Sequence, residues 1–70
     1  MTDIRAEITA SVWKVDVTAG QTVSENDEII ILESMKMEIP VVATVSGTVT
    51  EVHVAPDDQV TEGHLLVTIN

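Results

Sequence analysis

The residue that stands out for its chemistry is a lysine near the midpoint of the chain. Lys36 lies between Met35 and Met37, with Glu33 and Glu38 two or three residues away on either side. A lysine amine forms an amide with an activated carboxylic acid. At neutral pH almost every free lysine is protonated, so it does not acylate itself efficiently. If Lys36 is acylated, a separate ligase has to present the activated acid.

The remaining polar groups give no second reactive site. His53 and His64 have no third ligand at a metal-binding spacing, so we interpret them as surface residues and expect no metal site. The acidic groups at residues 25–28 and 57–58 lack the regular oxygen spacing of a calcium loop. No Ser/His/Asp or Cys/His set is evident, and three glycines are too few for a phosphate-binding loop. We therefore expect no catalytic residues, and a protein that is not itself an enzyme.

The composition limits the domain organisation and the partners. A chain of 70 residues suits one domain with one core, spanning residues 1–70. Twelve acidic residues against three basic ones give a formal charge of -9, which opposes binding to nucleic acid or membranes and favours a monomer. The chain has no cysteine, and its first residues lack the basic and apolar segments of a secretion signal. We expect a cytoplasmic protein without disulfides.

The chain repeats itself with a constant shift of 37 residues (49 − 12 = 37). Five residues recur: Val12, Val15, Val17, Val23 and Glu25 return as Val49, Val52, Val54, Val60 and Glu62. Both copies alternate β-branched and polar residues between turn residues, as strands do, although valine-rich strands also align by chance. Two such units can pack as facing sheets around one core. We therefore predict an all-β fold, a flattened β-barrel or sandwich of two quasi-symmetric four-stranded halves.

The segment that joins the halves has two interpretations. A helix would begin at Ser24 and stop before Pro40. Against it, residues 29–31 are three consecutive isoleucines, which resist a helix, and the repeat aligns them with a strand. We favour strands at residues 28–34 and 37–42, with Met35 and Lys36 as a tight hairpin turn. Such turns normally take Asn-Gly, so a Met-Lys turn indicates that the lysine itself is functional.

The segment from Glu33 to Glu38, with its Met-Lys-Met centre, resembles the attachment site of biotinyl domains, the carriers of biotin-dependent carboxylases. The resemblance covers essentially the whole chain, with Gly20 and Gly47 matching the family's turn glycines, and is greatest to single-domain biotin/lipoyl attachment proteins. It implies a barrel-sandwich hybrid of the hammerhead type. Three family glycines are replaced, by Ala10, Asn26 and Asp57, which bears on turn geometry. The gapless repeat leaves no room for the extra loop, or thumb, of some relatives.

The resemblance implies that biotin is attached covalently to Lys36 by a biotin protein ligase. The biotin would carry CO2 from a biotin carboxylase to a carboxyltransferase. Five neighbours of the lysine are candidate contacts for the ligase: Glu33, Ser34, Met35, Met37 and Glu38. The alternatives are solvated charges for the two acids and core positions for the two methionines.

Two other functions stay open. Lipoyl domains share the fold and Glu33, but there Asp typically precedes the lysine and Ala follows it, so the flanking methionines favour biotin. The third possibility is an unmodified β-sandwich interaction module. Trp13 is a candidate anchor for a partner, but we favour its covering the edge of the sandwich.

Overall fold

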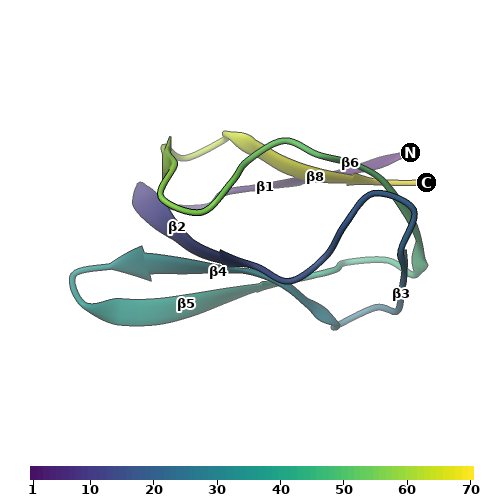
Figure 1. The fold of residues 1–70 in the computed structure, drawn as a ribbon, viewed down its shortest axis with the longest axis horizontal. Coiled ribbons are helices and arrows are strands. Elements are labelled where there is room, and N and C mark those ends of the chain that lie inside the picture. Colours follow the sequence, from purple (N-terminus) through teal and green to yellow (C-terminus); the bar gives the residue numbers. More distant parts are fainter.

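The protein is built only from strands. The computed structural model describes all residues, 1–70 (Figure 1). Its eight strands are β1 (Thr2–Arg5), β2 (Ala10–Val15), β3 (Thr22–Val23), β4 (Glu28–Ser34), β5 (Met37–Val42), β6 (Gly47–Val52), β7 (Gln59–Val60) and β8 (Leu65–Ile69). They form two antiparallel sheets of four strands, in the orders β1-β8-β6-β3 and β5-β4-β2-β7. The all-β sandwich prediction is confirmed, and the alternative helix before Pro40 is absent. No helix that could cross a membrane is found.

Neither sheet is formed by one repeat alone. The prediction that the two repeat units pack as two facing sheets is corrected in this respect. Each sheet takes two strands from the first half of the chain and two from the second. The reason is the tight turn at Met35 and Lys36, because a two-residue connection forces β5 to pair with β4. β1 then pairs with β8 in the other sheet, as β5 does with β4. The halves are therefore interleaved around one core.

The 37-residue repeat is confirmed in the strand pairing itself. In the β2–β4 ladder Val12 lies opposite Leu32 and Lys14 opposite Ile31, and the β6–β8 ladder has the equivalent pairs 49 with 69 and 51 with 68. Both ladders shift register between these pairs, at Trp13 in one sheet and Thr50 in the other. The two sheets thus share one backbone plan, which allows equivalent positions to be compared directly.

The core lies between the sheets and is almost wholly aliphatic. Nine large side chains are fully buried: Val12, Ile29, Ile30, Leu32, Val49, Val60, Leu66, Val67 and Ile69. Each such side chain stabilises the fold by about 1.5–3 kcal/mol relative to leaving it in water. No buried polar side-chain atom lacks a hydrogen-bond partner. The sandwich is therefore a firm base for whatever its exposed end presents.

The turns explain how the chain tolerates its missing family glycines. Gly20 and Gly63 have φ of +94° and +89°, and Asn26 and Asp57 have φ of +76° and +77°. The repeat places Gly20 opposite Asp57 and Asn26 opposite Gly63, so each kind of turn has glycine in one half only. Asn and Asp enter the left-handed region more easily than other side chains. The prediction that Gly20 lies in a turn is correct.

Gly47 is not a turn residue, contrary to the sequence-based expectation. It is the first residue of β6, with no positive φ. A Cβ there would meet the backbone carbonyl oxygen of Asn70, and would lie 2.9 Å from Cγ2 of Ile69. Thr48 and Asn70 hold this contact through two backbone hydrogen bonds of 2.8 and 3.1 Å. Close packing therefore accounts for glycine at this position.

Candidate functional site

Lys36 lies in a two-residue turn with unusual backbone angles. Met35 and Lys36 have φ of +52° and +64°, the mirror-image geometry that matches the twist of a hairpin. The flanking strands have the predicted bounds, with Ser34 opposite Met37 next to the turn. A non-glycine residue in this region costs about 1–2 kcal/mol. The long β4–β5 ladder holds the turn in place despite that cost.

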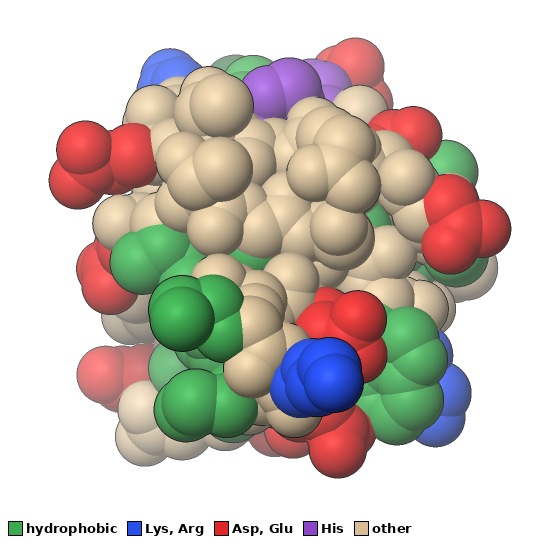
Figure 2. Space-filling model, turned by 90° about the vertical axis from the view of Figure 1, so that its left-hand side faces the viewer, with side chains coloured by type: hydrophobic (Ala, Val, Ile, Leu, Met, Phe, Trp, Pro, Cys, Tyr) green, Lys and Arg blue, Asp and Glu red, His purple; other side chains and the backbone are tan.

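The tip of this hairpin projects into solvent. The side chain of Lys36 is exposed, and Met35 and Met37 are 92% and 64% exposed. The two ion pairs of the structure, Arg5 with Asp3 and His53 with Glu51, do not involve Lys36. Figure 2 looks onto this end and shows a basic side chain with acidic groups beside it and hydrophobic groups to both sides. The amine is accessible from solvent, and both methionines lie outside the core.

An acidic pair flanks the turn. Glu33 on β4 lies directly opposite Glu38 on β5, and both side chains are exposed. Like charges at directly opposite positions destabilise a sheet, and neither carboxylate has an ion-pair partner to offset this. Ser34, the residue after Glu33 and the last of β4, is half-buried. The structure thus gathers the five candidate contact residues around Lys36, while their contact with a ligase stays a prediction.

The lysine and the chain ends lie at opposite ends of the molecule. Figure 1 shows the β4–β5 turn at one end of the long axis and both termini at the other. The domain measures 31 × 17 × 17 Å. Thr2 pairs with Ile69 near the chain ends. The 37-residue repeat makes this pair equivalent to Ile39 and Leu32, which pair near the hairpin turn in the other sheet. The hairpin tip is therefore clear of residues 1 and 70.

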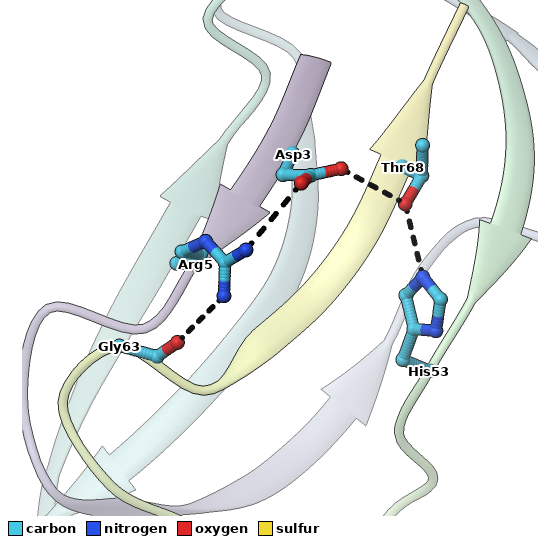
Figure 3. Close-up of polar contacts among 5 residues, drawn as sticks. All are labelled: Asp3, Arg5, His53, Gly63 and Thr68. Atoms are coloured by element: carbon cyan, nitrogen blue, oxygen red, sulfur yellow. Dashed lines mark hydrogen bonds and ion pairs between the residues drawn. The ribbon is translucent and has the colours of Figure 1, made fainter. Parts of the chain in front are cut away.

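A polar row on the outer face of the first sheet was not predicted. Thr68 Oγ1 lies 2.9 Å from Nε2 of His53 and 3.3 Å from a carboxylate oxygen of Asp3 (Figure 3). Arg5 donates to the carbonyl of Gly63 at 3.0 Å. These contacts join β1, β8 and the end of β6. Only the cross-strand register could have revealed this row, because Asp3 and Thr68 are 65 residues apart.

The two histidines considered in the sequence analysis lie in different parts of the structure. No three or more His, Cys, Asp or Glu side chains are arranged to hold a metal ion. His53 is half-buried in the polar row, and His64 is exposed in the turn before β8. A groove of about 440 Å³ runs between the edge strands β1 and β5, but none of residues 33–38 lines it. The amine of Lys36 therefore has no pocket of its own.

Comparison with known proteins agrees with this geometry. A family model described as "Biotin-requiring enzyme" matches residues 1–69. "Biotinylated protein TB7.3 homolog" of Mycobacterium leprae is 47% identical over 68 residues, or 97% of this chain and 96% of the relative. "Biotin/lipoyl attachment protein" of Bacillus subtilis is 43% identical over 67 residues, or 96% and 92% of the two chains. Part of the Kluyveromyces lactis urea carboxylase superposes with a TM-score of 0.92 at 35% identity, covering 99% of this chain and 6% of that one.

Proposed function

Because the chain belongs to the biotin/lipoyl attachment domain family, we propose that it is a biotin carboxyl carrier with Lys36 as its site of covalent attachment. The observation that carries the proposal is the position of Lys36. It is an exposed amine at the tip of a strained hairpin turn, at the end of the sandwich away from both termini. A turn built for stability alone would carry Asn-Gly.

The residues around the amine fit biotin as the attached group. Met35 and Met37 are exposed at the tip, so the fold does not require them as core residues. They match the Met-Lys-Met centre of biotinyl domains, whereas lipoyl domains typically have Asp and Ala at these positions. The name of the Mycobacterium leprae relative, a biotinylated protein, supports the same choice. Lipoate is the competing cofactor.

The chain itself contributes position and presentation to the reaction. The exposed turn lets the amine of Lys36 enter the active site of a biotin protein ligase. There the amine, after losing a proton, attacks the carboxyl carbon of the biotinyl adenylate that the ligase makes from biotin and ATP; the C–N amide bond forms as the bond to AMP breaks and AMP is released. Glu33 and Glu38 offer two carboxylates to basic groups of the ligase. When bound, biotin supplies a ring nitrogen that takes up CO2 and gives it to an acceptor. The rigid sandwich then fixes the base of the arm and raises its local concentration at partner active sites.

The proposed partners are a biotin carboxylase and a carboxyltransferase. The likeness to a domain of a urea carboxylase supports a place in a biotin-dependent carboxylase system. We place the protein in the cytosol, where ATP and bicarbonate are available to such enzymes. The domain would act there as a carrier and not as a catalyst.

Intact-mass and peptide mass spectrometry test the attachment site. The chain has only two lysines, Lys14 and Lys36, so Lys14→Arg is a matched control for Lys36→Arg. The full chain is incubated with biotin protein ligase, biotin and ATP, or with lipoate ligase and lipoate in a parallel reaction. We expect one biotin, less one water, in the wild type and in Lys14→Arg, and none in Lys36→Arg. Exclusive lipoylation would replace the cofactor, and a Lys36 that both ligases leave unmodified would favour an interaction module.

A further inference from the structure

The hairpin tip alone is too small to form a complete protein interface. Stable interfaces bury about 800 Å² on each partner. The end that carries Lys36 has a cross-section of about 17 × 17 Å, which is less than half of that area. A ligase contact of ordinary interface size that takes in Lys36 would therefore extend onto a face that adjoins the tip. The two outer faces of the sandwich are the candidates, and the internal repeat lets them be compared position by position.

The two outer faces share a backbone plan but differ in chemistry. Across the sheet β1-β8-β6-β3, one row holds Asp3, Thr68 and Glu51. These residues are polar, and Thr68 hydrogen-bonds to Asp3 and His53 (Figure 3). The equivalent row across β5-β4-β2-β7 holds Pro40, Ile31 and Lys14. Polar side chains of the first face hydrogen-bond to one another, whereas the second face exposes apolar side chains.

The strongest difference lies at the register shift of each sheet. Thr50 occupies it in one sheet, and Trp13 in the other. Trp13 is the only aromatic residue of the chain and is 46% exposed. The Nζ of Lys14 lies 5.7 Å from the centre of its ring. Because a threonine fills the same backbone position in the other half, the fold does not need the indole, and half-exposed tryptophans of this kind often anchor partners.

This face continues into the attachment hairpin. Pro40 lies four residues from Lys36 on β5, a distance of about 13 Å at 3.3 Å per residue. The row of Glu33 and Glu38 lies between Pro40 and the turn. Moving from the amine along this face, a bound enzyme would contact the acidic pair first and the apolar row next.

We propose that one outer face of the sandwich is the docking surface for the biotin protein ligase. This face, called the Trp13 face, consists of Trp13, Lys14, Ile31 and Pro40. The inference rests on the proposed function, because it presupposes that Lys36 is biotinylated. The ligase surface that fits it is apolar opposite Trp13 and Ile31, and basic opposite the Glu33–Glu38 pair. The ligase is favoured over the carboxylase enzymes because it must bring its activated acid to the amine itself. The carboxylase enzymes meet the cofactor at the far end of its arm.

Steady-state biotinylation of the full chain tests this surface. Initial rates are measured against carrier concentration, with a purified biotin protein ligase, biotin and ATP, for the wild type, Trp13→Thr and Ile31→Thr. Trp13→Thr copies the residue that the other sheet already has at this position. We expect its KM to rise at least about tenfold, as for an interface anchor, with kcat within about twofold of wild type. Trp13→Phe should recover much of the loss, and Thr50→Ala on the opposite face should behave as wild type.

The outcomes separate this inference from the proposed function. If the ligase modifies Lys36 in the wild type and Trp13→Thr has the same kcat/KM, the docking surface is wrong and the carrier function stands. If the wild type is not biotinylated at all, both proposals are overturned. Thermal unfolding of each variant checks that it is folded. Should Trp13→Thr fail to fold, Ile31→Thr decides, because an unchanged KM for that variant also contradicts the proposal.

Discussion

The turn that carries Lys36 should cost the protein stability, and this can be measured. Met35 and Lys36 both have positive φ, at +52° and +64°, although neither is a residue that favours it. Each non-glycine residue in this region costs about 1–2 kcal/mol. Replacing the pair by Asn-Gly, as Met35→Asn with Lys36→Gly, removes part of the cost at the first position and nearly all of it at the second.

We expect the double variant to be more stable by about 1–2 kcal/mol. The gain is less than the sum of the two costs, because glycine adds freedom to the unfolded chain. For a domain of this size, about 1 kcal/mol corresponds to about 4–8 °C in Tm, so Tm should rise by roughly 4–16 °C. Both side chains are exposed, so no core contact is lost in the exchange.

Urea and thermal unfolding, followed by circular dichroism on the unmodified chain, give the comparison. Gly20→Ala is the opposite control: its φ is +94° with open space around the Cβ position, so it should lose about 1 kcal/mol through backbone strain alone. A double variant that unfolds at the wild-type urea concentration with the same m value would refute the reasoning. The turn would then hold no strain that the sequence could relieve.

Three further variants probe the packing and charge described above. Gly47→Ala should destabilise the fold by about 1–3 kcal/mol in urea unfolding, because its methyl group would press on Ile69 and Asn70, and a neutral result would contradict the close approach. Glu38→Gln should stabilise the fold by about 0.3 kcal/mol in low salt and by less in 1 M salt, since it removes one of two opposed like charges; a loss of stability would contradict this repulsion. Thr68→Val should cost about 1 kcal/mol through loss of the bonds to His53 and Asp3, whereas the exposed Thr48→Val should change little.

Features set by local sequence could be predicted. The run of isoleucines before Lys36 disfavours a helix, and the repeat aligns these residues with the last strand of the chain, so the strand–turn–strand interpretation of residues 28–42 could be made from the sequence. The exposure of Lys36 and its place at one end of the sandwich follow from that hairpin. The positive φ of Asn26 and Asp57 also follows, since both residues replace glycines in turns.

Features set by distant pairing could not be predicted. β1 is a short segment that becomes a strand because it pairs with β8, at the far end of the chain. The interleaving of the halves depends on which edges the hairpin leaves free, a property of the whole fold. Gly47 was assigned to a turn because glycine usually marks one, whereas its role depends on contact with Ile69 and Asn70. The contrast between the two outer faces likewise appears only once the strands are in register.

The interleaved repeat makes the chain ends the counterpart of the attachment hairpin. At a shift of 37, Asn70 corresponds to Glu33 and Met1 to Glu38, and the β1–β8 ladder follows the β5–β4 ladder pair by pair. Four residues separate Glu33 from Glu38. Joining Asn70 to Met1 through the same four residues, Ser-Met-Lys-Met, would therefore close the chain into a ring with a second lysine tip at the opposite pole. Cutting the original turn would then yield a circular permutant in which β5 comes first and β4 last.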